Sequence, residues 1–113
     1  MGPNISASLT TPERMPKDLA SGDWHVVKGK EHEFQQRWTD FLEWTKASSP
    51  GFVRAILIRD LRDPAHFVSV GFWEGADARN SWQSNQEFAA KFGACRELCS
   101  DVRSGSFELA KAI

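Results

Sequence analysis

The sequence predicts an α+β domain of the ferredoxin-like type, in which a split β-α-β unit builds a four-stranded antiparallel sheet with its helices on one face. Three observations support this fold. Strand and helix patterns alternate in the order β-α-β-β-α-β, the helical segments each have one apolar face, and a short turn joins the two middle strands. A length of 113 residues suits one such domain.

A strand and a helix occupy the first part of the predicted domain. Residues 19–27 (LASGDWHVV) read as a strand weakened by Gly22, and residues 28–30 turn the chain. A helix follows, because apolar side chains recur at helical spacing from Phe34 onward. This face consists of Phe34, Trp38, Phe41, Leu42 and Thr45. The run Ser-Ser-Pro-Gly at 48–51 ends the helix, since proline cannot continue it.

Two strands joined by a short turn form the predicted hairpin. Residues 52–60 (FVRAILIRD) are apolar and β-branched at the centre, which predicts a strand buried on both faces. Residues 66–74 (HFVSVGFWE) alternate instead, which predicts two different faces. One face carries Phe67, Ser69, Gly71 and Trp73, and the other carries His66, Val68, Val70 and Phe72. The turn at 61–64 is short enough to make the pair antiparallel.

The last third of the chain reads as a short helical segment, a second amphipathic helix and a closing strand. Residues 77–82 form the short segment, and Ser84 or Asn85 can cap the helix that follows. The inward face of this helix consists of Phe88, Phe92, Cys95 and Cys99. The closing strand is predicted over residues 102–110.

One face of the predicted sheet has no cover of its own. The helices shelter only one side, whereas the other side carries Val68, Val70, Phe72 and the apolar residues of 52–58. An apolar sheet face of this kind is a typical interaction surface. The sequence therefore predicts a homodimer in which two such faces pack together and close a barrel-like core.

Composition and charge limit the partners of the chain. A net charge of −1 provides no basic face for nucleic acid, and no window holds the roughly 18 apolar residues that span a membrane. Residues 1–18, rich in Ser, Thr and Pro, are expected to be a flexible arm ahead of a domain at residues 19–113. The start of the sequence lacks a secretory signal pattern, so a cytoplasmic location is expected.

The two cysteines do not predict a metal or redox centre. Cys95 and Cys99 are four residues apart and would share one face of a helix. No second Cys pair or nearby His completes a ligand set, so both are expected to be small buried side chains and no metal site is expected. The sequence also lacks a hydrolase triad, a phosphate-binding loop and a dinucleotide-binding fingerprint.

Several short motifs occur together in one order along the chain. They are Val27-Lys28-Gly29-Lys30-Glu31 before the first helix, Ser49-Pro50-Gly51-Phe52 at a strand start, Arg62-Asp63-Pro64 in the hairpin, Phe72-Trp73-Glu74 at a strand end, and Trp82 with Asn85-Gln86-Glu87-Phe88 after it. Over residues 19–113 this pattern resembles the antibiotic biosynthesis monooxygenase family of the dimeric α+β barrel superfamily.

The resemblance implies a homodimer with a pocket in each subunit, between the helices and the sheet. Members of the family include cofactor-free oxygenases of aromatic polyketides or quinols, haem-degrading enzymes and proteins without known activity. The haem-degrading branch has a strand Trp, which Trp73 matches, but its iron-binding His and its pocket Asn correspond here to Phe92 and Gly22. Phe cannot bind iron and Gly has no hydrogen-bonding side chain, so haem degradation in that manner is not expected.

A cofactor-free oxygenase needs a dry apolar pocket and a group that stabilises a substrate anion, because an electron-rich phenolate can itself give an electron to O₂. The residues expected to line such a pocket are Trp73, Trp24, Phe88, Phe92, Gly71 and Arg54. Arg54 either binds an anionic substrate group or pairs with an acid across the dimer. His25 and His66 have the opposite strand parity and His32 begins a helix, so all three are expected outside the pocket. The sequence names no catalytic residue.

The leading hypothesis is a monooxygenase-like protein that oxidises a small aromatic molecule without metal or flavin, so no cofactor is expected. The alternative is a non-catalytic dimeric protein of the same fold that binds a small molecule. A pocket that places Arg54 or a His within hydrogen-bond reach of a ligand favours the enzyme. A dry pocket without an ionisable side chain favours the alternative.

Overall fold

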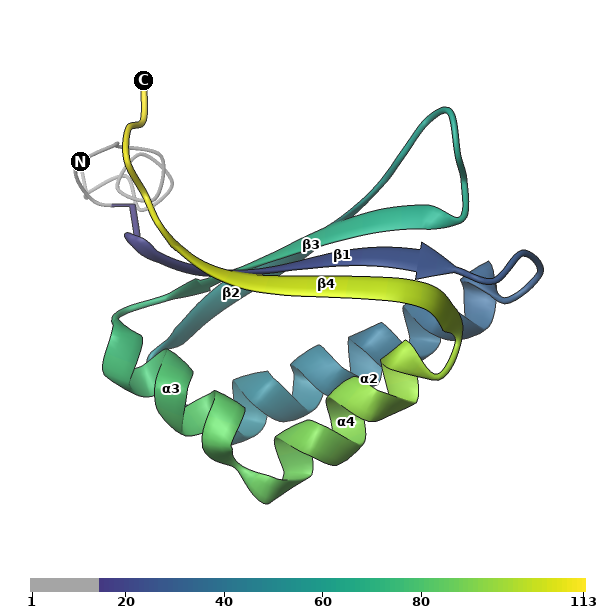
Figure 1. Cartoon of the computed structure of the whole chain (residues 1–113). Coiled ribbons are helices and arrows are strands. Elements are labelled where there is room, and N and C mark those ends of the chain that lie inside the picture. Colours follow the sequence, from purple (N-terminus) through teal and green to yellow (C-terminus); the bar gives the residue numbers. More distant parts are fainter. Residues whose placement is uncertain (1–14) are drawn as a thin grey trace, which may run out of the picture.

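The computed structural model describes residues 15–113, which form four strands and three helices. The elements follow in the order β1 (Asp18–Val26), α2 (Glu31–Ser48), β2 (Phe52–Arg59), β3 (His66–Trp73), α3 (Ala76–Ser84), α4 (Gln86–Arg96) and β4 (Cys99–Glu108). The strands form one antiparallel sheet in the order β2-β3-β1-β4 (Figure 1). This is the ferredoxin-like topology that the sequence predicts, with β1 and β3 at the centre.

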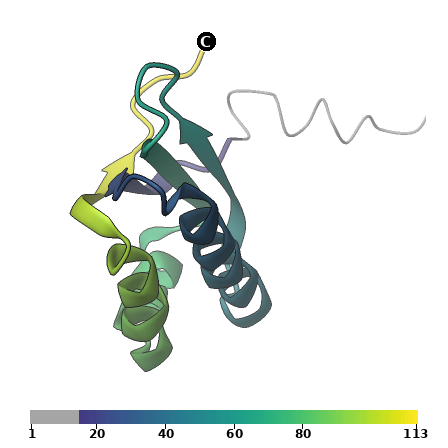
Figure 2. The same cartoon turned by 90° about the vertical axis from the view of Figure 1, so that its right-hand side faces the viewer.

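The molecule has two layers. All three described helices lie on one face of the sheet, and the opposite face carries no described helix (Figure 1). Turned by 90°, the structure shows α2 and α4 side by side beneath the sheet (Figure 2). The largest buried side chains come from both layers, and they include Trp24, Phe34, Phe41, Phe67 and Trp73, each at most 3% exposed. The core therefore lies between the helices and the sheet.

The alternation along β3 separates the two faces of the sheet as predicted. Phe67, Ser69 and Trp73 are buried, whereas the residues between them keep part of their surface exposed. Trp24 of β1 pairs with Phe67 in the register and is buried beside it. Side chains of neighbouring strands at paired positions point to the same face, so β1 and β3 together form the floor of the core.

The outward face of the sheet is divided between apolar and charged side chains. Across the strands its rows read Arg54–Phe72–Leu19–Phe107, then Ile56–Val70–Ser21–Gly105, then Ile58–Val68–Asp23–Arg103, and last His66–His25–Asp101. Ile56, Ile58 and Phe107 are 36%, 55% and 58% exposed. The prediction that β2 is buried on both faces is therefore wrong within residues 15–113, because none of the elements that the structure describes covers the outward side.

Local interactions set the ends of the helices. Before α2, Gly29 has a φ of 94°, a conformation that glycine adopts without steric cost, and its N–H donates to the Glu31 carboxylate at 2.9 Å. At the start of α4, the side chain of Asn85 accepts the N–H of Glu87 at 2.8 Å. Of the two predicted caps, Asn85 is therefore the one that the structure uses.

The end of α4 differs from the prediction. The helix ends at Arg96, Leu98 turns into the core, and β4 begins at Cys99 instead of residue 102. Cys99 therefore pairs with Val26 in the sheet and does not share a helix face with Cys95. The prediction of a shared helix face from the four-residue spacing is wrong, because the helix ends between the two cysteines. The N–H of Leu98 donates to the Cys95 carbonyl at 3.2 Å in the turn that ends it.

Both cysteines carry unreactive thiols, Cys95 buried and Cys99 half-buried. Burial raises the pKa of Cys95 to about 12, and burial likewise raises the pKa of Cys99 to about 11. Since the thiolate is the reactive form, neither thiol is a nucleophile at neutral pH.

The predicted flexible arm, residues 1–18, lies mostly outside the described residues. Asp18, which the prediction placed in the arm, is the first residue of β1, and its carboxylate accepts hydrogen bonds from Arg79 of α3 at 2.5 and 3.2 Å. Just before it, the Lys17 carbonyl accepts the N–H of Leu109 at 2.8 Å. None of the helices within residues 15–113 is both long enough and apolar enough to cross a membrane.

Candidate functional site

Aromatic side chains from both layers meet between the helices and the sheet. Trp82 of α3 stacks on Phe41 of α2 with ring centroids 5.7 Å apart and planes 11° apart, and it lies 4.8 Å from Trp73 of β3. At the other end of the group, Phe92 of α4 lies 5.2 Å from Trp24 of β1. These separations are typical of favourable aromatic pairs, so the rings form one continuous cluster.

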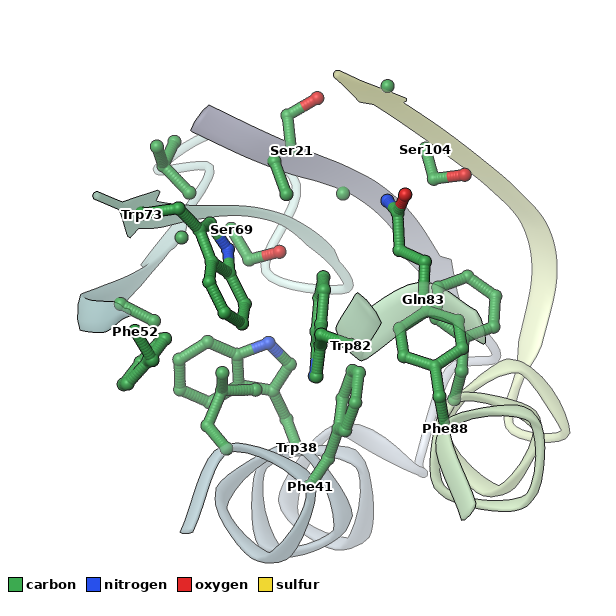
Figure 3. Close-up of a pocket in the computed structure, with 18 of the residues that line it drawn as sticks. Ser21, Trp38, Phe41, Phe52, Ser69, Trp73, Trp82, Gln83, Phe88 and Ser104 are labelled. Carbon is green, nitrogen blue, oxygen red and sulfur yellow. The ribbon is translucent and has the colours of Figure 1, made fainter. Parts of the chain in front are cut away.

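A cavity of about 290 Å³ lies within this aromatic cluster (Figure 3). Its lining includes Trp24, Trp38, Phe41, Leu42, Phe52, Trp73, Trp82, Phe88 and Phe92. Trp38 and Phe41 reach up from α2, Trp73 reaches down from the sheet, and Trp82 stands between them (Figure 3). Gln83 and Ser104 also line the cavity and are exposed, so they mark its mouth. The size and lining suit a small, planar, apolar ligand.

Five of the six residues predicted to line a pocket surround this cavity. They are Trp73, Trp24, Phe88, Phe92 and Gly71. Arg54 does not line it, which corrects the prediction: its guanidinium lies on the outward face of the sheet, 6.0 Å from the centre of the Phe72 ring. Side chains alternate along β2 and the register shifts between Phe52 and Arg54, so Phe52 and Ala55 take the cavity side.

Three indole N–H groups at the cavity differ in their hydrogen bonds. Trp24 donates to the hydroxyl of Ser69 at 3.0 Å, and Trp82 donates to the hydroxyl of Thr45 at 2.9 Å. Trp73 is fully buried, and its Nε1 has no hydrogen-bond partner within residues 15–113. A buried donor without an acceptor costs about 1–3 kcal/mol. A ligand oxygen that accepted this N–H would remove that cost.

Two glycines keep space beside these indoles. A Cβ at Gly22 would lie 2.5 Å from Trp24 Nε1 and 2.7 Å from Ser69 Oγ, which is closer than non-bonded atoms approach. A Cβ at Gly71 would lie 3.5 Å from Trp73 Nε1 and would cover part of that free N–H. Gly22 therefore permits the Trp24–Ser69 hydrogen bond, and Gly71 leaves the Trp73 N–H without a side chain packed over it.

The side chains that line the cavity, all within the described part of the chain, include no ionisable group. The polar groups on the cavity side are the hydroxyls of Ser69 and Ser104, the amide of Gln83 and the indole N–H groups. The hydroxyl of Ser21 points away from the cavity, to the outward face of the sheet (Figure 3). The cavity can therefore enclose an aromatic ring and donate a hydrogen bond to it, but the lining supplies no general base.

The lining does not fit haem. Phe92 is the residue that the resemblance matches to the iron-binding His, and its ring stacks on Phe88 with centroids 5.5 Å apart. Among the described residues that line the cavity there is no His, Cys, Met or Tyr to bind iron. Gly22 occupies the position of the pocket Asn, where a larger side chain would collide with Trp24. The cavity is therefore incompatible with haem degradation through those residues.

The three histidines lie away from the cavity, in agreement with their strand parity and helix position. His25 and His66 stack on the outward face of the sheet, with ring centroids 4.3 Å apart and planes within 2°. His32 is exposed in the first turn of α2.

Sequence reasoning missed several residues of the cavity. Trp38 and Phe41 were placed on the buried face of α2 but were not connected with a pocket, although that face had to point at the sheet. The sequence motif that contains Trp82 does not show that its ring lines a cavity. The alternation that places Ser69 on the inward face likewise does not predict its contact with the cavity. Gln83 carries no sequence signal, because an exposed polar residue on a short helix is ordinary.

The fold and the cavity together define a class: a small ferredoxin-like α+β protein with an aromatic cavity between its single layer of helices and its sheet. The model of the antibiotic biosynthesis monooxygenase family matches residues 21–92. The chain belongs to this family, as the motifs indicated. No curated protein matches the sequence.

Solved structures share this fold at low sequence identity. SnoaB, a cofactor-independent oxygenase from Streptomyces nogalater, is 23% identical, with a TM-score of 0.74 over 86% of this chain and 97% of that chain. A predicted antibiotic biosynthesis monooxygenase from Deinococcus radiodurans is 18% identical, with a TM-score of 0.73 over 85% and 95% of the two chains. A conserved protein from Methanosarcina mazei Go1 is 14% identical, with a TM-score of 0.73 over 84% and 94%. These similarities establish the fold.

Proposed function

We propose that the protein is a cofactor-independent monooxygenase that oxidises a small aromatic molecule with a phenolic or quinol oxygen, bound in the aromatic cavity. The buried N–H of Trp73, which has no acceptor within residues 15–113, is the observation that carries this proposal, because a substrate oxygen would satisfy this donor in a mainly apolar enclosure. Membership of the antibiotic biosynthesis monooxygenase family supports it. The fold shared with SnoaB, itself a cofactor-independent oxygenase, supports it as well.

The cavity contributes binding, exclusion of water and stabilisation of charge. The aromatic walls enclose the ring of the substrate, and Trp73 donates to its oxygen. A hydrogen bond to an anionic oxygen contributes about 1.5–3 kcal/mol. The phenolate supplies the electrons for O₂: one oxygen atom replaces the single hydrogen of a ring C–H as a carbonyl, and the phenolic oxygen becomes the second carbonyl. The other oxygen atom leaves as water with the ring hydrogen and the phenolic proton.

Trp73→Phe tests the role of the indole N–H. The substitution keeps an aromatic ring but removes the donor, so we expect about tenfold weaker binding of a hydroxynaphthoquinone, measured by quenching of tryptophan fluorescence. Naphthalene, which has no oxygen, should bind with nearly unchanged affinity.

Trp82→Phe is the matched control for this substitution. Trp82 also lines the cavity, but its N–H is already bonded to Thr45. If Trp82→Phe and Trp73→Phe weaken the hydroxynaphthoquinone equally, or if Trp73→Phe weakens naphthalene as much, the Trp73 N–H is not the group that recognises the oxygen.

The pH dependence of oxidation tests whether the substrate loses its proton to water or to a base of the protein. Because the lining supplies no base, the substrate must lose its proton to water, and the rate of O₂ consumption should rise about tenfold per pH unit below the substrate's own pKa. An inflection at a pH that stays the same for substrates of different pKa would reveal a protein base and contradict this mechanism.

A non-catalytic binding protein is the second candidate function. The absence of an ionisable group from the described lining favours it, since such a lining binds a small molecule but supplies no acid or base for its conversion. Ligands that quench the tryptophan fluorescence but consume O₂ no faster than in buffer would support binding without chemistry.

We further propose that the protein is a cytoplasmic homodimer, with the outward faces of two sheets packed together. The exposure of Ile56, Ile58 and Phe107 on that face supports the dimer. Fractionation of cells tests the cytoplasmic location, and the mass in solution tests the homodimer.

A further inference from the structure

Four side chains of metal-binding types meet at one end of the outward face of the sheet, opposite the cavity. They are Asp23 and His25 of β1, His66 of β3 and Asp60, which follows β2. The ligand atoms of Asp23, His25 and His66 all lie within 4.8 Å of one another. The sheet holds them there, because His25 pairs with His66 and Asp23 lies two residues earlier on the same face.

We propose that Asp23, His25 and His66 bind a divalent transition-metal ion of the Zn²⁺ type. Two imidazole nitrogens and one carboxylate oxygen are a common ligand set for Zn²⁺ and its first-row neighbours. The proposal adds a site on the face away from the aromatic cavity, and it does not depend on the oxygenase function. It also revises the expectation of no metal site, which had considered the cysteines.

The donor distances fit such an ion once the two stacked rings turn, because an imidazole nitrogen binds a metal in the plane of its ring and these planes are now parallel within 2°. Nε2 of His66 lies 2.5 Å from Oδ1 of Asp23, and Nε2 of His25 lies 3.7 Å from the same oxygen. Tetrahedral Zn²⁺ at about 2.0–2.1 Å from each donor separates the donors by roughly 3.3 Å. Each of these two separations therefore changes by less than about 1 Å when the ion replaces the hydrogen-bonded proton.

Asp60 provides a second feature that is typical of metal-binding histidines. Nδ1 of His66 lies 3.1 Å from Oδ2 of Asp60, which leaves Nε2 to face Asp23. A metal-bound histidine usually donates its other ring N–H to a carboxylate, and this contact fixes the orientation of the ring. The Asp60 carboxylate is itself held by the N–H of Arg62 at 2.8 Å.

The charge around the cluster favours a dication. Asp101 pairs with His25 in the register and adds a third carboxylate to those of Asp23 and Asp60. Arg103, the neighbouring cation on β4, lies 3.7 Å from Asp101. Among these side chains, the three carboxylates outnumber the one guanidinium, and this excess of negative charge beside the two imidazoles attracts a divalent cation.

The cluster is also accessible to an ion. The side chains of Asp23 and His25 are both 42% exposed. The cluster lies at the end row of the sheet, beside the turns at 27–30 and 60–65, whereas the apolar residues of the outward face extend toward Phe72 and along β2. In the proposed dimer the cluster therefore lies at the rim of the contact.

Equilibrium dialysis of the chelator-treated full chain against ZnCl₂ at pH 8 tests the site. This pH is chosen because the hydrogen bond to Asp60, and next that to Asp23, raises the pKa of His66 above its ordinary value, and protons compete with the metal. We expect one zinc ion per chain. His25→Asn and His66→Asn should each lower the affinity at least about tenfold, because each removes one of three ligands. His32→Asn is the matched control and should bind as the wild type does.

A spectroscopic measurement on the wild-type chain guards against variants that fail to fold. Zn²⁺ should shift the imidazole NMR signals of His25 and His66 and leave those of His32 unchanged. Asp60→Asn, which removes only the orienting carboxylate, should lower the affinity by about 10–100-fold. Three results would overturn the proposal: unshifted His25 and His66 signals, wild-type affinity in both histidine variants, or half an equivalent of zinc per chain, which would mean that two copies share the ion.

Discussion

Thr45 shows how one buried hydroxyl organises the aromatic cavity. The side chain is fully buried in α2, and its Oγ1 donates to the Phe41 carbonyl at 2.9 Å while it accepts the indole N–H of Trp82 at 2.9 Å. Trp82 comes from another helix, α3, so this hydrogen bond fixes the position of a ring that lines the cavity between Trp73 and Phe41. The indole N–H of Trp82 therefore has an acceptor in Thr45, whereas that of Trp73 has none within residues 15–113.

Thr45→Val should lower the free energy of unfolding by about 1–3 kcal/mol, because valine keeps the shape of threonine but leaves the Trp82 N–H buried without an acceptor. Urea denaturation followed by tryptophan fluorescence measures this change. Thr39→Val is the matched control: Thr39 is exposed, and its hydroxyl also donates one helical turn back, to the Gln35 carbonyl at 2.8 Å. Equal losses in both variants would show that the Trp82 hydrogen bond contributes nothing.

At the scale of elements, α3 is held to the sheet by one arginine. The Arg79 side chain donates two hydrogen bonds to the Asp18 carboxylate of β1 and a third to the Ser106 hydroxyl of β4 at 3.0 Å. Arg79 and Asp18 are only 12% and 17% exposed, so water screens this pair less than a surface pair. Since α3 carries Trp82 and Gln83 to the cavity, the position of this helix shapes the site.

Arg79→Lys should reduce the free energy of unfolding by about 1–2 kcal/mol, because an ammonium group cannot make the two parallel hydrogen bonds of a guanidinium. It should also weaken ligand binding, since α3 is held less firmly. Chemical denaturation and fluorescence titration measure the two effects. Arg62→Lys, in an exposed turn, is the control. A loss of the same size in Arg62→Lys would attribute the effect to the change of residue type alone.

At the scale of the whole molecule, the outward face of the sheet leaves apolar side chains exposed within residues 15–113. Ile56 and Ile58 of β2 and Phe107 of β4 are exposed in the single chain, although one-sided sheets normally carry polar residues toward water. A second copy packed on this face would bury these side chains, and each fully buried Ile contributes about 1.5–3 kcal/mol.

We expect the wild-type protein to sediment at about twice its chain mass of 12.7 kDa. Ile56→Glu should shift it to the monomer, because a carboxylate in that contact would be desolvated without a partner. Leu61→Glu is the control, since Leu61 is 97% exposed in the turn outside the sheet and should leave the dimer intact. A monomeric wild type at micromolar concentration would contradict the proposed assembly.

The sequence by itself determined the elements and the faces that they present. Periodicity around Phe34 predicted α2, and alternation from His66 to Trp73 predicted which side chains of β3 are buried, because these are properties of short stretches of chain. The expected order of strands and helices follows from those stretches and from the short turn between β2 and β3. Five aromatic and glycine positions of the cavity were predictable for the same reason.

Only the tertiary structure decided which atoms from different elements meet. The direction of Arg54 depends on a register shift, the end of α4 depends on Leu98 entering the core, and the free N–H of Trp73 depends on the absence of an acceptor among its described neighbours. The cluster of Asp23, His25, His66 and Asp60 brings the end of β1 next to the β2–β3 turn, and Asp23 and His66 are 43 residues apart in the chain. Such contacts depend on strand pairing and side-chain direction over long sequence separations, which local patterns do not encode.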